Sequence, residues 1–281
     1  MKKILLINDV VGHSHVGMVA MLPILSHLGH LTYNLPTALV SNTLDYGRFS
    51  VLETTNYMRD TIPVWEKLGF RFDAACTGLM FSEEQARTVA SYCRSLREQG
   101  TTLFVDPVMG DGGRLYNGIS NRQVELMREM VGICDLTLPN YTEACYLSGI
   151  PYRAEGLGWN EACSMLDGIA RLGARAVIVT SARVDGRSCV VGRRSEQPLA
   201  GFRQHLDEGL YFKLDYDEIP AAFHGTGDIF SALLIGRLLN GSPLKESTRY
   251  AMDIVSSLID HNRHLTDLCN GIPVERCLNL L

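Results

Sequence analysis

The 281-residue sequence predicts a single α/β domain of three layers, in which helices cover both faces of a mostly parallel central sheet. Short continuous apolar runs alternate with segments of helical spacing, a pattern typical of parallel strands buried on both faces. Residues 189–213 show a shorter, alternating pattern, which indicates antiparallel strands at one edge. No repeat, low-complexity tract or long linker divides residues 1–281.

The predicted strands are short apolar runs that end in polar residues. In chain order they are residues 4–7, 39–40, 74–76, 102–105, 136–138 and 176–179. A loop rich in Gly and His, residues 8–17, follows the first strand.

The predicted helices lie between these strands and after the last of them, and most open at a residue that caps helix N-termini. The signals are Ser82 with Gln85, Ser120 with Gln123, Asn140, Asn160, and Ser242 with Pro243 at the first helical position. Residues 18–28 also have helical spacing, and Gly29 is a plausible end for that helix.

Composition and charge exclude several classes of protein. The hydrophobic share is 46% and the charged share 20%, as in ordinary globular proteins. The net charge is −5 with no basic block, so we expect no nucleic-acid partner. No apolar run is long enough for a membrane span, and the first run is too short for a signal peptide. The eight scattered cysteines lack metal-ligand spacing and indicate reduced thiols in a cytoplasmic protein.

Polar residues follow every predicted strand. They are Asn8-Asp9, Ser41-Asn42, Thr77-Gly78, Asp106, Asn140 and Thr180-Ser181. Any one of them could be an ordinary turn former. Because parallel strands share a carboxyl edge, where open α/β sheets bind ligands, six such clusters favour a binding crevice.

The chain is organised around the turn Gly225-Thr226-Gly227-Asp228, which leads directly into an apolar helix. The glycines allow a tight bend and close approach of a ligand. The first N–H groups of a helix have no partners and favour an anion. Asp228 could cap this helix or act as a base beside a bound phosphate.

A second acidic segment extends from Asp106 to Tyr116 and contains Asp111 among glycines. Carboxylates beside a nucleotide suit Mg²⁺, and Asn140 and Glu143 follow the next strand. Asp111 could equally be a turn residue and Glu143 a first-turn helix acid. The sequence lacks both the P-loop pattern and a glycine fingerprint after the first strand, so phosphate binding falls to the turn at 225–228.

Four motifs together resemble the pyridoxal kinase branch of the ribokinase-like superfamily. They are Val105–Asp111 with Tyr116, Leu138–Ala144, Thr180-Ser181, and Gly225–Asp228, in the family's order and spacing over nearly the full length. The resemblance implies an ATP- and Mg²⁺-dependent kinase that phosphorylates the hydroxymethyl group of a vitamin B6 compound. It also implies a homodimer, possible assistance by K⁺, and a small flap over the substrate, here about residues 41–55.

The resemblance also implies roles for individual residues. Asp228 would be the general base, and Gly225, Thr226 and Gly227 would form the anion hole. Nucleotide-binding residues would be Asp106, Tyr116, Asn140, Thr180 and Ser181, and metal-binding residues Asp111 and Glu143. The substrate would contact Asp9, Val16, Thr43, Leu44 and Leu79, together with Asp228.

The substrate end departs from the family pattern. Asp9 stands where a Ser is common, Leu44 where a Thr is common, and Leu79 where an aromatic residue is common. A carboxylate at position 9 would favour a protonated ring nitrogen, or it could only cap the following turn. Hydroxymethylpyrimidine is therefore the alternative substrate, followed by a sugar or nucleoside. A dinucleotide-binding oxidoreductase and a catalytically silent binding protein are the alternatives from other classes.

Overall fold

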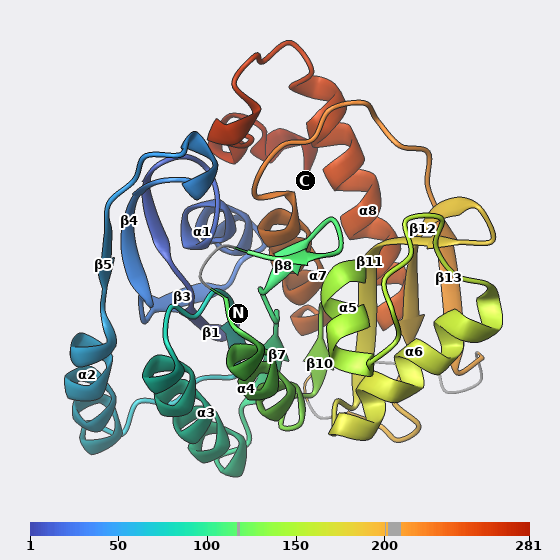
Figure 1. Cartoon of the computed structure of the whole chain (residues 1–281). Coiled ribbons are helices and arrows are strands. Elements are labelled where there is room, and N and C mark those ends of the chain that lie inside the picture. The colour runs from blue at the N-terminus through green and yellow to red at the C-terminus, as the bar shows by residue number, and fades with distance from the viewer. Residues whose placement is uncertain (117–118, 200, 202–208) are drawn as a thin grey trace.

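An eight-stranded sheet crosses the computed structural model in the order β13-β12-β11-β10-β7-β6-β1-β3 (Figure 1). The structure describes residues 1–116, 119–199, 201 and 209–281. The strands of this sheet are β1 (Lys3–Ile7), β3 (Leu31–Asn34), β6 (Ala74–Thr77), β7 (Thr102–Val105), β10 (Leu136–Thr137), β11 (Ala176–Val184), β12 (Arg187–Arg193) and β13 (Tyr211–Asp215). From β3 at one edge through β1, β6, β7 and β10 to β11, neighbouring strands pair in parallel. Strands β12 and β13 pair antiparallel at the other edge, as the sequence predicts.

Helices cover both faces of the sheet. They are α1 (Met18–His27), α2 (Thr55–Lys67), α3 (Glu83–Glu98), α4 (Asn121–Val131), α5 (Tyr141–Ser148), α6 (Trp159–Leu172), α7 (Thr226–Leu239) and α8 (Leu244–His261). Helices α2 to α6 share one apolar cluster with the sheet, and α1, α7 and α8 share another. The predicted three-layer αβα architecture is confirmed.

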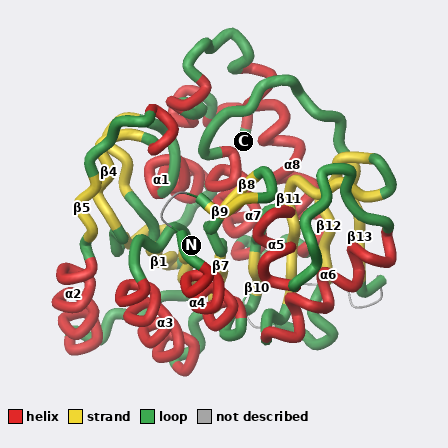
Figure 2. The backbone as a smooth tube through the Cα atoms, in the orientation of Figure 1, coloured by secondary structure: helices red, strands yellow, loops and turns green. Residues whose placement is uncertain are grey.

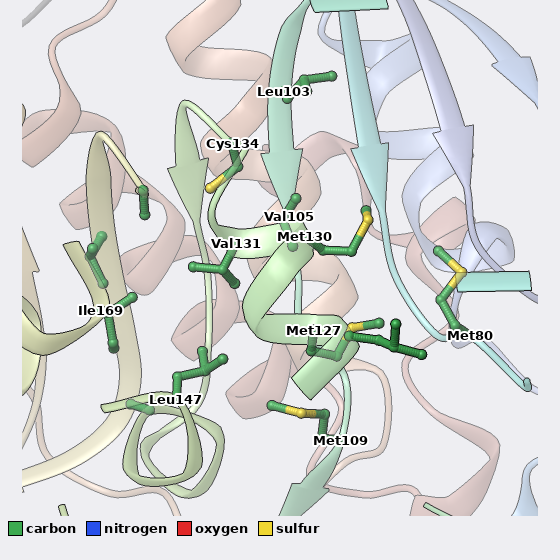
Figure 3. Packing of buried hydrophobic residues seen from close by; sticks show 14 of the residues in the cluster. Met80, Leu103, Val105, Met109, Met127, Met130, Val131, Cys134, Leu147 and Ile169 are labelled. Atoms are coloured by element: carbon green, nitrogen blue, oxygen red, sulfur yellow. The ribbon is translucent and has the colours of Figure 1, made fainter. Parts of the chain in front are cut away.

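The strand residues alternate between these two clusters. In β1, Leu5 points into the first cluster and Leu6 into the second, as the two-residue period of a strand requires. Figure 3 shows part of the first cluster, where Met127 and Val131 of α4 lie against the strand that carries Leu103. Burial on both faces explains why the strands appear in the sequence as continuous apolar runs.

A small second sheet contains β2 (Val10–His13), β4 (Ala38–Asn42) and β5 (Val51–Glu53), with β4 and β5 at the left of Figure 2. The run at residues 39–40 therefore does not belong to the central sheet, and Ser41-Asn42 does not lie at its carboxyl edge. The central sheet instead has β3, which sequence analysis missed because this edge strand is mostly exposed and has no apolar run. Part of the expected loop 8–17 is β2.

Several predicted boundaries need correction. Pro243 is the N-cap of α8, so the helix begins at Leu244 and not at the proline. Helix α6 begins at Trp159, because Glu161 accepts a hydrogen bond from the N–H of Gly158 and caps that end without Asn160. Strand β11 passes Thr180 and ends at Val184, with an irregular register between Val179 and Ala182. The capping signals at Ser82, Ser120 and Asn140 are confirmed.

All eight cysteines are free, and six of them are buried, as predicted for core residues. Within the ranges that the structure describes, no helix has the length and apolar character needed to cross a membrane.

Candidate active site

The predicted base, Asp228, lies in the first turn of α7, where it contacts the loop after β1. Its Oδ2 accepts a hydrogen bond from the backbone N–H of Gly17 at 2.8 Å. Its Oδ1 accepts one from Nδ2 of Asn8 at 3.3 Å. The side chain does not cap its own helix, since Gly225 is the N-cap without a side-chain cap. The carboxylate is therefore fixed at the carboxyl edge of the sheet.

The turn before Asp228 has the shape of an anion site. Gly225 has a φ of 78°, and a Cβ there would lie 2.6 Å from the backbone oxygen of His15. In contrast, a Cβ on Gly227 would have no heavy atom of the described residues within 4 Å. The turn is thus packed on one side and open on the other, and the free N–H groups of the helix start lie at this turn. An anion can approach them from the open side.

Two further carboxyl groups lie close enough to Asp228 to interact with its charge. Burial, followed by the charge of Asp228, raises the pKa of Asp9 to about 7 and that of Asp106 to about 7. Ser231, one turn after Asp228 on α7, donates a hydrogen bond to Oδ2 of Asp106 at 3.1 Å. This hydrogen bond lowers the pKa of Asp106 and so partly offsets the effect of burial. Burial also raises the pKa of Asp228, against the effect of its donors Gly17 and Asn8. Such a cluster favours a cationic partner, since opposite charge stabilises the ionised acids.

The predicted metal residue Glu143 is only 3% exposed, and both of its carboxylate oxygens accept hydrogen bonds from backbone N–H groups. Its Oε1 accepts from the N–H of Met109 at 2.9 Å, and its Oε2 from the N–H of Asn140 at 2.8 Å. Nδ2 of Asn140 donates in turn to the backbone oxygen of Gly110 at 2.8 Å. In this conformation Asn140 and Glu143 cap α5 and hold the hairpin of β8 (Gly110–Asp111) and β9 (Arg114–Leu115).

The same hairpin presents the other predicted metal residue. Asp111 is exposed, and among the described residues the one donor to its Oδ1 is the neighbouring Gly112 N–H, at 2.7 Å. Tyr116 follows β9 at the end of the segment and is 43% exposed. Its partial burial, followed by the charges of Glu143 and Asp111, raises its pKa. Asp111 and Tyr116 thus lie at the open side of the hairpin.

The remaining nucleotide residues are next to α5. Thr180 pairs with Asn140 in an isolated parallel bridge, and its N–H donates to the backbone oxygen of Pro139 at 3.0 Å. Ser181 is exposed and has a φ of 54°, at the irregular position of β11. The structure therefore brings Thr180 to Asn140 and places Ser181 on the adjoining surface.

The predicted substrate residues lie in two groups. Asp9, Val16 and Leu79 are at the ends of β1 and β6 and at the anion turn. Asp9 lies against Gly17, since its Oδ1 would be 2.8 Å from a Cβ at that position. Val16 lies against Gly225, since its Cγ1 would be 2.9 Å from a Cβ there. The backbone N–H of Leu79 donates to Oδ1 of Asn8. Thr43 and Leu44 lie in the flap.

The flap is fastened beside the anion turn by its own short helix, η1 (Leu44–Tyr46). Oγ1 of Thr43 donates to the backbone oxygen of Cys269 at 3.3 Å, and the Tyr46 hydroxyl donates to Asp267 at 2.6 Å. Asp45 lies 3.0 Å from Nδ1 of His224, the residue before Gly225. Leu44, between these contacts, is 37% exposed.

Sequence reasoning assigned no role to three residues that the structure places at the site. Asn8 and Gly17 donate to Asp228, and Ser231 donates to Asp106. Ser231 had a usable signal in its spacing, because residues three apart on a helix share a face. Asn8 had one in its place after the first predicted strand. The contacts of Asn8 and Gly17 with Asp228 bridge more than 200 residues of sequence, which spacing alone does not predict.

Comparisons with known proteins point to one family. A family model described as phosphomethylpyrimidine kinase matches residues 17–272. Two crystal forms of a Bacteroides thetaiotaomicron protein, provisionally assigned as a phosphomethylpyrimidine kinase, match with TM-scores of 0.90 and 0.88 at 32% and 31% identity. Each match covers 99% of this chain, and 93% and 95% of the respective crystal chains. The second form was crystallised with pyridoxal.

Two sequence relatives are named as kinases of vitamin B6 compounds. The pyridoxal kinase of Arabidopsis thaliana is 34% identical over 163 residues, which are 57% of this chain and 48% of that protein. The pyridoxine/pyridoxal/pyridoxamine kinase of Bordetella avium is 28% identical over 263 residues, covering 89% of this chain and 83% of that protein.

Proposed function

Because the chain belongs to the phosphomethylpyrimidine kinase family, we propose that it transfers a phosphoryl group from ATP to the hydroxymethyl group of a vitamin B6 compound. The acceptor would be pyridoxal, pyridoxine or pyridoxamine, for salvage to pyridoxal 5′-phosphate. One observation carries the proposal: the Asp228 carboxylate is fixed beside the open N-terminus of α7. A base and an anion site thus adjoin each other, as phosphoryl transfer to an alcohol requires.

The proposed reaction uses these groups directly. The substrate alcohol loses its proton to Asp228 as its oxygen forms a bond to the γ-phosphorus and the bond to ADP breaks. The N–H groups of the turn 225–228 stabilise the negative charge on the transferred group. The fastened flap turn, residues 43–46, closes the site against water beside this turn.

Mg²⁺ and K⁺ also belong to the proposal. Mg²⁺ commonly takes one or two carboxylates together with substrate phosphates. Asp106 and the exposed Asp111 are the carboxylates that would hold it. Bound Mg²⁺ would supply charge neutralisation at the phosphates. Glu143 would contribute through the hairpin that it holds. The assistance by K⁺ and the cytoplasmic location stay predictions of the sequence.

Vitamin B6 is favoured over hydroxymethylpyrimidine by the names of the relatives and by the pyridoxal in the Bacteroides crystal. The kinase relatives also weigh against an oxidoreductase. The decisive experiment is a turnover screen with ATP and Mg²⁺, with and without K⁺, across the three B6 compounds, hydroxymethylpyrimidine and several sugars. We expect phosphorylation of a B6 compound to dominate. A preference for hydroxymethylpyrimidine, or no turnover of any B6 compound, would overturn the proposal.

Asp9 is the proposed partner of the substrate ring nitrogen, and Asp9→Asn tests this with two readouts. The folded pKa of about 7 lies above the usual 3.8, so the ionised group costs stability that grows as pH rises from 4 through 7. We expect Asp9→Asn to raise the Tm at pH 8 and to lose this advantage as the pH falls toward 4. We also expect a higher KM for pyridoxine. An equal Tm difference at every pH, or an unchanged KM, would contradict this role.

A homodimer is the proposed assembly. Most large apolar side chains that the structure shows exposed lie between residues 31 and 70, in or next to β3, the small sheet and α2. They include Leu31, Tyr33, Leu39, Phe49, Val51, Leu52, Tyr57, Val64, Leu68 and Phe70. An exposed apolar surface of this kind favours a partner. Light scattering on the purified protein should give a molar mass of two chains, and a single-chain mass would refute the dimer.

A further inference from the structure

We propose that Asn8 is a positioning residue for the phosphoryl transfer, holding the Asp228 carboxylate in the orientation that accepts the alcohol proton. This inference rests on the proposed function, because it gives Asn8 its role through the base. Asn8 stands at the end of β1, and Asp228 lies 220 residues further along the chain. The contact between the two side chains joins the central sheet to the anion turn.

The orientation of the Asn8 carboxamide is fixed by its neighbours. Its Oδ1 lies 3.0 Å from the backbone N–H of Asp9 and 3.0 Å from that of Leu79. Both partners are donors, so the acceptor oxygen must face them. The amide nitrogen must then face Asp228 Oδ1, at 3.3 Å. A flipped carboxamide would put three donors together without an acceptor.

The space around this carboxamide is built to its shape. Asn8 is 4% exposed, and a Cβ on Gly78 would lie 2.3 Å from its Oδ1. Any larger residue at position 78 would displace the carboxamide. Nδ2 also meets the sulfur of Met21 at 3.8 Å on the α1 side. The Asn8 side chain therefore has a single favoured orientation, in which Nδ2 faces the Asp228 carboxylate.

Asp228 depends on that donor because of what surrounds it. Three ionisable groups interact electrostatically with Asp228. They are Asp9 from the loop after β1, Asp106 from the end of β7 and the Cys76 thiol from β6. Ionisation of any of these groups disfavours a carboxylate at 228. Burial of Asp228 itself raises its pKa, and the donors that lower it again are the backbone of Gly17 and the side chain of Asn8. Within the described ranges, Asn8 is the one side chain that donates to this carboxylate.

Two variants separate positioning from folding. Asn8→Asp keeps the size of the side chain and the oxygen for Asp9 and Leu79, but it replaces the donor that faces Asp228 with a carboxylate oxygen and adds a like charge. Asn8→Ala removes the whole carboxamide. We expect kcat at pH 7 to fall roughly 10- to 100-fold in Asn8→Ala, the effect of losing one hydrogen bond to a charged group, and by at least as much in Asn8→Asp. The acid limb of the kcat profile should move to higher pH, while the KM for ATP stays unchanged.

Asn262→Ala is the matched control, because Asn262 is also buried, at 3% exposure, and its Nδ2 donates to Leu258 and Cys277 and not to Asp228. It should lose stability and keep the wild-type pH profile. Unchanged kcat and an unmoved acid limb in Asn8→Asp would overturn the inference. So would losses in the Asn8 variants that follow the folded fraction alone, as in the control.

A readout without turnover keeps this test apart from the proposed reaction. The ¹³C carboxyl signal of Asp228, identified by its absence in Asp228→Asn, can be titrated in the wild type and in Asn8→Ala. We expect its midpoint at a higher pH in Asn8→Ala. Equal midpoints would refute the role of Asn8, whatever the acceptor proves to be. An inactive wild type with a shifted midpoint would refute only the proposed reaction.

Discussion

Asp228→Ala should lower kcat by at least ~10²–10⁴-fold, the contribution typical of a positioned base, while ATP still binds. The carboxylate is fixed by Gly17 and Asn8 and makes no cap for α7, so its removal takes away the proton acceptor without removing a capping bond of the helix. Steady-state kinetics with a B6 acceptor, together with calorimetric titration of ATP, would measure the two effects separately.

The control for this experiment is Asp253→Ala. Asp253 is an acid on the neighbouring helix α8, with its side chain 64% exposed. We expect wild-type turnover from this variant, since exposed substitutions away from a site have small effects. Near-normal turnover in Asp228→Ala would exclude the assigned base. Loss of ATP binding in the same variant would show that Asp228 serves the nucleotide.

The arrangement at Asp228 also shows which parts of the site the sequence can predict. The turn at 225–228 is local: glycines, a helix start and an acid stand within four residues, so their mutual placement follows from chain geometry. The same holds for Asn140 and Glu143, whose reciprocal capping of α5 follows from a three-residue spacing. The same two side chains also form hydrogen bonds to the backbone of Met109 and Gly110. These contacts, which hold the hairpin, do not follow from that spacing.

The strands of the fold also differ in whether the sequence predicts them. Strands buried on both faces, such as β1 and β7, are visible as apolar runs because every residue faces a core. Strand β3 is exposed at the sheet edge and β2 is a short, partly exposed strand, so neither carries that signal. The run at Leu39-Val40 is apolar although only Val40 is buried, and it belongs to the small sheet, since an apolar run does not specify which sheet a strand joins.

Gly225→Ala and Gly227→Ala should both lower kcat, for different reasons that stability measurements can tell apart. At position 225 the φ of 78° is strained for alanine, and the new methyl would lie 2.6 Å from the His15 oxygen, a backbone atom that cannot turn away. We expect a loss of ~1–3 kcal/mol in the free energy of unfolding. We also expect kcat to fall by ~10²-fold, because the turn must shift.

At position 227 a methyl group meets nothing within 4 Å, so the fold should keep its stability or gain up to ~1 kcal/mol of helix propensity. The methyl would instead occupy the open side of the turn, and we expect kcat to fall by ~10²-fold, as when an anion-hole donor is lost. Gly186→Ala is the control for backbone strain, because its φ of 77° matches that of Gly225 in an uncrowded turn between β11 and β12. It should lose some stability and no activity. Full activity in Gly227→Ala would mean that the transferred phosphoryl group does not approach α7 from the open side.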